Sequence, residues 1–481
     1  MNLTARLEGE ITMSATSAGL TGDYDPDTPR TRSFHNRVAG FRAGDESPRD
    51  YLEECLATID ELEGTVRAWV CLNAEEARKA ADEASARYKS GTTRSPIDGM
   101  PIGIKDVIQT HDMPTTLGSP IFEGRNTGID SASVNALRLA GAVVLGKTVT
   151  TEFAFMVPGP TTNPYCANAT PGGSSSGSAA AVGAGMVPAA LGNQVVGSII
   201  RPAGYCANVA IKPTLGALHG GEGLSLSQLH LGVHAGSLED MWSVAYEIGQ
   251  RAGGDPGYPG LYGPAQIAPP SAPRRLVVLE TEGWSTRDTT TAGAFDAVLA
   301  QLRKHGVTLL TRGDNPAIER LERSIEASVP LCRVLCSYEM RWALRAYRRT
   351  GLLSSELGNW LDMAEVLTPD DYREALAQRA AIRSNFEALA PLADGFITLA
   401  SPGPAPTIGE VTGGEGGYGF VTGDPAFNAA TSLLGCPTIT LPLISVRGLP
   451  VGVQLIAQPH DDWPLTGMAQ WAQSAVKPVV A

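Results

Sequence analysis

The stretch PGGSSSGSAAAVGAGMVPAALGNQVVGSIIRPAGYCANVAIKPT, from Pro171 to Thr214, guides the interpretation of the whole chain. It contains five serines, many glycines and alanines, and no acidic residue. Small residues at this density indicate close backbone approach, tight turns and exposed backbone N–H groups. Serine hydroxyls in such a setting are candidate nucleophiles, and the N–H groups are candidate donors to a developing oxyanion.

Several pieces of the chain resemble the signature sequence of the amidase signature family. Within the stretch they are Gly172-Gly173-Ser174-Ser175, the small-residue run 178–182, Gly197-Ser198-Ile199, Arg201-Pro202-Ala203 and Lys212-Pro213-Thr214. Upstream, Pro101-Ile102-Gly103-Ile104-Lys105-Asp106 matches the family segment that carries a lysine. The resemblance extends from about Tyr51 to about Leu465, which is most of the chain.

The resemblance implies an enzyme that cleaves amides with a Ser–Ser–Lys triad. In the family the nucleophilic serine lies 24 residues after a serine that follows a cis peptide bond, and Ser198 lies 24 residues after Ser174. The implied roles are Ser198 as nucleophile, Ser174 as bridging hydroxyl and Lys105 as proton acceptor. The implied oxyanion donors are the backbone N–H groups of Val195, Val196, Gly197 and Ser198.

The neighbours of Lys105 agree with such a role. A lone lysine in a strand is usually a solvated edge residue, but Ile102, Ile104 and Val107 surround this one with apolar side chains. Burial of this kind disfavours the ammonium form and lowers the pKa of a lysine. A neutral amine could then accept the nucleophile's proton through Ser174 and return it to the leaving nitrogen.

The fold class follows from the alternation of helical and strand patterns. We expect a helix over Ser131–Leu139 and a buried strand over Val143–Lys147, an order typical of α/β proteins. The resemblance implies the amidase signature fold, with a large mixed central β-sheet covered by helices on both faces. Residues 1–30 are predicted to form a mobile N-terminal arm and 31–481 a single amidase domain, in which 218–400 is a divergent, substrate-facing region.

Local signals predict the first helices. Ser47 is a candidate N-cap before Pro48 at the first helical position, and Gly64 is expected to end that helix. Asn73 and Glu76 form a candidate capping box for the next helix, which should end near Gly91.

Candidate substrate-binding residues come from two places. Phe155 ends the segment 151–155, which resembles the family segment that lines the acyl pocket, and Met156 follows it. The region 331–342 is a further candidate, and ordinary core packing explains all three at least as well. Ser175 either contacts substrate or supports the serine-rich loop.

The segment before Ser198 departs from the common family pattern. Val196 stands where many relatives have glycine, Gln194 stands where they have aspartate, and Arg201 comes one residue later. The shifted Ile-Arg-Pro-Ala sequence resembles family branches that include biuret- and carboxybiuret-type hydrolases. The resemblance therefore extends the expected substrates from small amides to carbamate (urethane) or urea-like compounds.

Other candidate sites fit the sequence less well. Ser175 lies in a nucleophile-elbow pattern, but turn-like residues replace the strand that an elbow needs. The glycine-rich loop lacks the Gly-Lys-Ser/Thr ending of a phosphate loop. Cys206 has no evident base beside it and is expected to be buried. His230 and His234 should lie at the surface or just behind the site, and Cys332 with Cys336 lacks further ligands; we expect neither a metal nor a cofactor.

Composition excludes some partners. The 481 residues carry a net charge of -13, which disfavours binding to nucleic acid and to anionic membranes. No apolar run of 18 residues and no signal peptide are evident, and the seven cysteines look like scattered thiols. We expect a cytoplasmic protein that acts on a small amide-like molecule, and its N-terminal helices could pair in a homodimer.

Two alternatives to an independent amidohydrolase stay open. One is the glutamine-hydrolysing subunit of a transamidation complex, against which the acidic balance and the altered segment before Ser198 argue. The other is a catalytically inactive scaffold with the same fold, against which the presence of all three triad positions argues.

Overall fold

The computed structural model describes residues 20–221, 226–412 and 419–481. Twelve strands in these ranges form one sheet, in the order β1-β3-β2-β4-β6-β5-β10-β11-β9-β7-β8, with β12 pairing to β10. The strands are β1 (Trp69–Leu72), β2 (Pro101–Lys105), β3 (Val143–Thr148), β4 (Ala189–Gln194), β5 (Val209–Lys212), β6 (His230–Ala235), β7 (Arg275–Val278), β8 (Thr308–Leu310), β9 (Gly395–Leu399), β10 (Thr438–Val446), β11 (Leu449–Ile456) and β12 (Val479–Val480).

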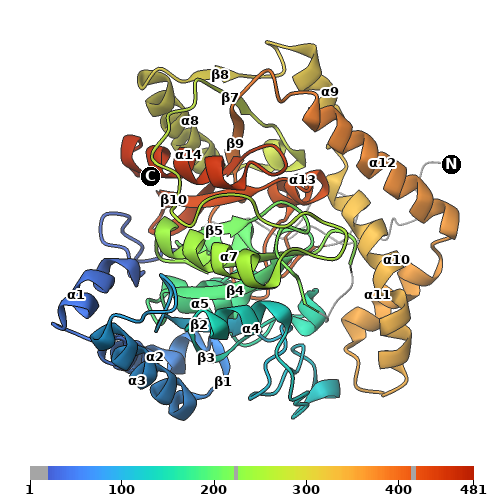
Figure 1. Cartoon of the computed structure of the whole chain (residues 1–481). Coiled ribbons are helices and arrows are strands. Elements are labelled where there is room, and N and C mark those ends of the chain that lie inside the picture. The colour runs from blue at the N-terminus through green and yellow to red at the C-terminus, as the bar shows by residue number, and fades with distance from the viewer. Residues whose placement is uncertain (1–19, 222–225, 413–418) are drawn as a thin grey trace.

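The sheet is mixed, as the sequence predicts. Strand β2 runs parallel to β3 and β4, whereas β6 is antiparallel to both β4 and β5. Strands β10 and β11 form an antiparallel hairpin that joins the two halves of the sheet. The chain's last strands thus return to the middle of the sheet (Figure 1).

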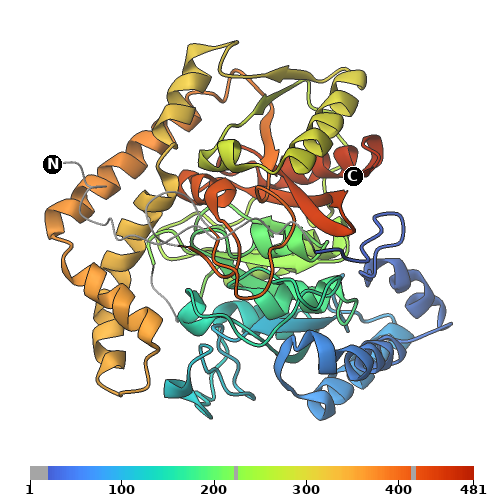
Figure 2. The same ribbon diagram turned by 180° about the vertical axis from the view of Figure 1, so that it is seen from behind.

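Helices cover both faces of the sheet. They are α1 (Val38–Ala43), α2 (Pro48–Val66), α3 (Ala74–Ser90), α4 (Ala132–Leu139), α5 (Ser176–Gly183), α6 (Ile200–Tyr205), α7 (Leu238–Ala252), α8 (Thr289–Lys304), α9 (Pro316–Ser324), α10 (Ser328–Arg348), α11 (Ser355–Glu365), α12 (Pro369–Glu387), α13 (Ala426–Leu434) and α14 (Asp462–Ala475). Helices α4, α7, α8 and α14 lie on one face and α5 and α6 on the other, while α10–α12 stand at one side (Figures 1 and 2). Within the described ranges, no helix is both long and apolar enough to cross a bilayer.

The glycine-rich stretch forms the buried centre of the molecule. All eight residues of α5 are buried, which leaves no room for side chains larger than those of its Ser, Ala and Val residues. A Cβ atom on Gly177 would lie 2.3 Å from both the Ala68 oxygen and the Val149 nitrogen. A Cβ atom on Gly183 would lie 2.1 Å from the Cys206 oxygen. The density of small residues therefore reflects backbone approach, as the sequence indicates.

We expect Gly177→Ala to destabilise the fold by about 1–3 kcal/mol, because the added methyl group would overlap two backbone segments that cannot move independently. Denaturant unfolding measures the change. Gly293→Ala is the matched control, since nothing lies within 4 Å of a Cβ atom at this position in α8. There the substitution should stabilise by about 0.5–1 kcal/mol. Equal effects at the two positions would contradict the packing argument.

The first helices follow their sequence signals with two corrections. Ser47 caps α2 in a capping box with Asp50. However, α2 continues past Gly64 to Val66, because Arg67 adopts the left-handed conformation and the Glu63 carboxylate accepts the next two backbone N–H groups. The capping box predicted at Asn73 is absent, since its side-chain amide donates to Asp112 Oδ2 at 3.2 Å instead.

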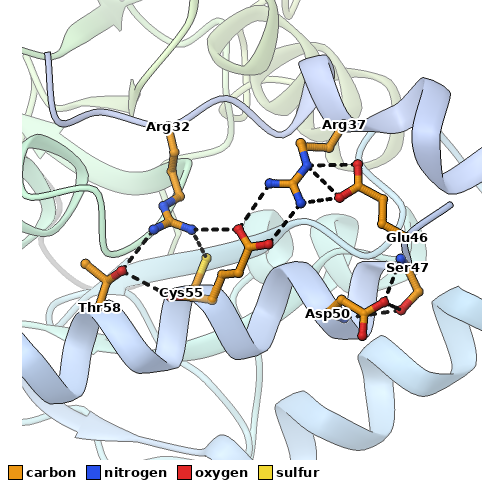
Figure 3. A network of polar contacts seen from close by, with 8 residues as sticks. Arg32, Arg37, Glu46, Ser47, Asp50, Cys55 and Thr58 are labelled. Carbon is orange, nitrogen blue, oxygen red and sulfur yellow. Dashed lines mark hydrogen bonds and ion pairs between the residues drawn. The ribbon is translucent and has the colours of Figure 1, made fainter. Parts of the chain in front are cut away.

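The segment before α1 is fastened to the body by charged side chains. Figure 3 shows Arg32 and Arg37 reaching from this segment to the start and middle of α2. Arg32 donates to Thr58 Oγ1 at 2.9 Å, and Arg37 Nε donates to Glu46 Oε2 at 2.7 Å. The N-terminal segment and α2 therefore form one unit.

The arm predicted for residues 1–30 is described only from residue 20 onward, and residues 1–19 lie outside the described ranges. Tyr24 is 4 % exposed, and its hydroxyl donates to the Pro442 carbonyl at 2.9 Å. The Gly22 N–H donates to the Arg447 carbonyl at 3.0 Å. Residues 20–30 thus lie against the β10–β11 hairpin.

Candidate active site

Lys105 ends strand β2 in the interior of the molecule. Its side chain is fully buried, and its Nζ atom lies 2.8 Å from Ser174 Oγ and 2.5 Å from Asn193 Oδ1. The adjacent Asp106 turns away and forms a buried ion pair of 3.3 Å with Lys147. The amine of Lys105 is therefore surrounded by neutral polar groups.

This environment determines the protonation of Lys105. Burial lowers the pKa of Lys105 well below its ordinary value, because the ammonium form loses its hydration and gains no opposite charge. This environment favours the neutral amine, which can act as a proton acceptor.

Ser174 follows a cis peptide bond with Gly173, as the resemblance implies. The loop around this bond is held by Arg201, which is buried in α6. The Arg201 guanidinium donates to the Gly173 carbonyl at 2.8 Å and to the Thr422 carbonyl at 2.9 Å. Segments more than 200 residues apart in the chain thus meet at Ser174.

Ser198 lies in the turn between β4 and α6, together with Val195, Val196 and Gly197. No described residue accepts from the backbone N–H groups of these four residues, so the groups are available to a ligand. Ser174 and Ser198 line the same cavity, although Ser174 Oγ pairs with Lys105 and forms no hydrogen bond with Ser198 within the described ranges. Such contacts are often long in a site without substrate.

Gln194 organises this turn. Its Oε1 atom accepts from the N–H groups of Ile199 and Ile200 at 2.8 and 3.0 Å and so caps α6. Its Nε2 atom donates to Ser432 Oγ at 3.0 Å, and Ser432 Oγ donates to the Val196 carbonyl at 2.8 Å. The glutamine that departs from the family pattern therefore fixes both ends of the turn.

We expect Gln194→Leu to lower kcat by about 10–100-fold, because the turn loses its anchors and the N–H groups lose their alignment. The free energy of unfolding should also fall by about 1–3 kcal/mol, since buried donors lose their acceptor. Steady-state kinetics and denaturant unfolding measure the two effects. Gln458→Leu is a control, because within the described ranges the side chain of this half-buried glutamine forms a single hydrogen bond, to the Phe386 carbonyl in α12. An unchanged kcat in Gln194→Leu would show that the turn keeps its conformation without the side chain of Gln194.

The cavity beside the two serines encloses about 720 Å³ of empty space, including its mouth. Its lining is mostly apolar and includes Phe155, Met156 and Trp360. The described part of the lining has two basic residues, Arg201 and Arg333, and no acidic one. The remaining lining residues are Phe153, Ala154, Ser174, Asn193, Val195, Val196, Gly197, Ser198, Leu226, Leu229, Val329, Cys332, Cys336, Phe420, Thr422 and Pro425.

The structure places some of the predicted substrate-binding residues in the cavity lining and others outside it. Phe155 and Met156 line the cavity, but Ser175 is fully buried outside the lining, where its hydroxyl donates to the Asn193 carbonyl at 3.3 Å. This position agrees with the loop-supporting role of Ser175. In the region 331–342, one face of α10 lines the cavity and Trp342, which is 66 % exposed, points away from the core.

The structure also shows where the other candidate site residues lie. His230 and His234 are buried in β6, behind the site and not at the surface, and the three strand residues between them place them about 13 Å apart. Cys206 is buried, which raises the pKa of its thiol and agrees with a packing role. A loop, and not a strand, precedes Ser175, so the elbow is absent from this position.

The structure contains one group of candidate metal ligands within the described ranges. Ligand atoms of His111, Asp112 and Asp130 lie within 4.8 Å of one another near the surface. Arg138 forms ion pairs with both carboxylates at 2.7 and 3.1 Å. The arginine already supplies the positive charge that these carboxylates attract.

Comparison with known proteins places this geometry in a family. The family model described as Amidase matches residues 50–465. The chain is 31% identical to a glutamyl-tRNA(Gln) amidotransferase subunit of Anaeromyxobacter sp. (strain K), over 92% of this chain and 96% of the relative. It is 32% identical to the AtzE subunit of the 1-carboxybiuret hydrolase of Pseudomonas sp. (strain ADP), over 88% and 94%.

Solved structures agree with the family match. The crystal structure of an amidase superposes with a TM-score of 0.77 at 27% identity, covering 92% of this chain and all of that one. The mixed sheet with helices on both faces is therefore the architecture of the family as well as of this chain. On these grounds the chain belongs to the amidase signature family, an enzyme family that acts on the carbon–nitrogen bonds of amides.

Proposed function

We propose that this protein hydrolyses a small amide or amide-like compound through Ser198, Ser174 and Lys105. The observation that carries the proposal is the 2.8 Å contact between Ser174 Oγ and a buried Lys105 Nζ, at the wall of the cavity that Ser198 also lines. Burial lowers the pKa of Lys105 and so favours the neutral amine, which can take a proton, and a hydroxyl beside it can relay one.

In the proposed reaction Ser198 Oγ attacks the substrate carbonyl carbon and releases its proton to Ser174 Oγ. Ser174 passes its own proton to Lys105 Nζ. Ser174 thus gains one proton and loses one, and Lys105 holds the proton until the C–N bond breaks. The N–H groups of residues 195–198 stabilise the oxyanion, each donor being worth about 2.7–4 kcal/mol in the transition state. The leaving nitrogen takes the proton back as the C–N bond breaks. Water, activated by the same relay, then hydrolyses the acyl-enzyme on Ser198.

The lining of the cavity supports a substrate with an apolar body. Phe155, Met156 and Trp360 offer aromatic and thioether surface, and polar groups are concentrated around the serines. Such a wall favours aryl or aliphatic amides among the candidates. Carbamate and urea-like substrates form the second candidate class, which the similarity to one subunit of a 1-carboxybiuret hydrolase favours.

A second candidate function is glutamine hydrolysis within a transamidation complex. The relatives that are subunits of glutamyl-tRNA(Gln) amidotransferases favour it. In that case the purified chain should need added partner subunits for full glutaminase activity.

An inactive scaffold of the same fold is the third candidate. Residues 31–481 as one domain, a cytoplasmic location and a homodimer stay predictions.

A panel of substrates tests the proposal. Purified protein and Ser198→Ala are incubated with an aryl amide, an aliphatic amide, a carbamate, a urea-like compound and glutamine, and release of ammonia or amine is measured. Turnover that requires Ser198 supports the proposal, and the best substrate selects the class. Hydrolysis of glutamine alone favours a role in a transamidation complex. A lack of turnover with every compound would favour the inactive scaffold.

A further inference from the structure

Asn193, near the end of β4, contacts the amine of Lys105 with two of its oxygens. The Lys105 Nζ atom lies 2.5 Å from Asn193 Oδ1 and 3.5 Å from the Asn193 backbone oxygen. Its third polar neighbour is Ser174 Oγ at 2.8 Å. Among the described residues, Asn193 thus supplies two of the three hydrogen-bonding contacts of this fully buried nitrogen.

The three oxygens differ in what they can do. Carbonyl oxygens only accept hydrogen bonds, whereas a serine hydroxyl both donates and accepts. A neutral lysine amine carries two N–H groups and one lone pair. When the two oxygens of Asn193 accept the N–H groups, the lone pair faces the remaining neighbour, which is the hydroxyl of Ser174. That hydroxyl is the only one of the three that can donate a proton.

We propose that Asn193 is a positioning residue, which holds the N–H groups of Lys105 and so directs its lone pair at Ser174. The proposal rests on the proposed function, in which Lys105 receives the proton that leaves Ser198 through Ser174. Asn193 itself exchanges no proton, because a carboxamide does not titrate in the working range of an enzyme.

A neutral side chain is required at this place. A carboxylate of the same shape would pair with the ammonium form of Lys105 and keep the proton on the lysine. The other titratable groups around Lys105 do not supply that charge. Asp106 is paired with Lys147, and burial lowers the pKa of His234 on β6 to about 3, which keeps its imidazole neutral. Asn193 therefore offers oxygens without charge.

The Asn193→Asp variant tests this inference through its pH profile. We expect the acidic limb of kcat/KM to move upward by about 1–3 pH units, because an opposite charge in contact raises the pKa of Lys105 by that amount. Activity should be partly recovered at alkaline pH, where the lysine loses its proton. A limb at the wild-type position would overturn the proposal.

Asn193→Leu is the matched variant, because leucine has a similar size and no side-chain oxygen. We expect kcat to fall by about 10–100-fold with KM nearly unchanged, and the acidic limb not to move upward. A merely structural role would lower the thermal stability of both variants and would leave kcat of a folded Asn193→Leu protein close to that of the wild type. Thermal unfolding of both variants shows whether each one folds.

Direct titration of Lys105 separates this inference from the proposed function. Protein labelled with 13C at lysine Cε is titrated by NMR, and Lys105→Met identifies the resonance. In Asn193→Asp the Lys105 resonance should titrate at higher pH than in the wild type, whether or not any substrate is turned over. An unchanged midpoint contradicts the role of Asn193. A shifted midpoint in a protein without turnover refutes only the proposed function.

Discussion

Ser198→Ala should lower kcat by about 10⁴–10⁶-fold for the best substrate of the panel, because the attacking oxygen is removed while the cavity stays intact. KM should change little, since the β-carbon of residue 198 and the backbone N–H groups of the turn are retained. Initial rates at saturating substrate measure the loss. In the wild type, an acyl-enzyme should also be trapped by acid quenching and located on Ser198 by mass spectrometry.

Ser175→Ala is the control for this prediction. Ser175 neighbours Ser174 in the chain, but it lies outside the cavity lining, and among the described residues its hydroxyl donates to the Asn193 carbonyl alone. We expect a loss of no more than about 10-fold, the scale of one neutral hydrogen bond. If Ser175→Ala were as inactive as Ser198→Ala, the assignment of the nucleophile would be wrong.

Lys105→Met should lower kcat/KM by about 10²–10⁴-fold and remove the acidic limb of the pH profile. In the wild type, activity is lost as the pH falls through the pKa of Lys105, because the ammonium form cannot accept a proton. Burial lowers that pKa, so the limb should lie well below about 10.4, the value for a free lysine. Rates from pH 5 to 10, with a check of stability at each pH, measure both effects.

The same substitution should stabilise the fold although it lowers kcat/KM. Between the lowered pKa of Lys105 and about 10.4, the unfolded chain binds a proton at this residue that the folded chain does not. The stability of the wild type therefore rises with pH across this window, and Lys105→Met lacks this contribution. The difference between the free energies of unfolding of the two proteins should shrink toward pH 10. A difference that is constant with pH would mean that Lys105 stays charged in the fold.

The sequence predicts much of this site because its signals are local or evenly spaced. The small residues around Gly177 indicate close packing, and the apolar neighbours of Lys105 indicate burial. The spacing between serines, together with the family resemblance, selects Ser174 and Ser198 from the five serines of the stretch. These signals need no knowledge of the rest of the chain.

The supports of the site could not be predicted in this way. Ser432 reaches Val196 from 236 positions away, and Thr422 reaches Arg201 from 221 positions away. No local pattern marks either contact. Asn193 gave no signal because asparagine is ordinary near the end of a strand, although its place in a buried strand beside the serine-rich stretch could have prompted attention.

The errors at helix ends have a similar cause. Gly64 is a plausible stop signal, but the side chain of Glu63 satisfies the backbone groups beyond it. Asn73 is a good capping residue that Asp112, on a distant loop, engages instead. Propensity describes what a residue favours alone, and tertiary partners override it.

The cavity has two walls of different origin. One consists of the sheet end and loops that carry Ser174, Asn193 and Ser198, and the other comes from α10 and α11, more than 120 residues later in the chain. A mutation on the outer wall, for example at Trp360, whose ring packs against Phe155, alters the shape offered to a substrate without touching the proposed proton relay. Natural or laboratory evolution can therefore exchange substrates in this scaffold while the bond-breaking machinery is inherited unchanged.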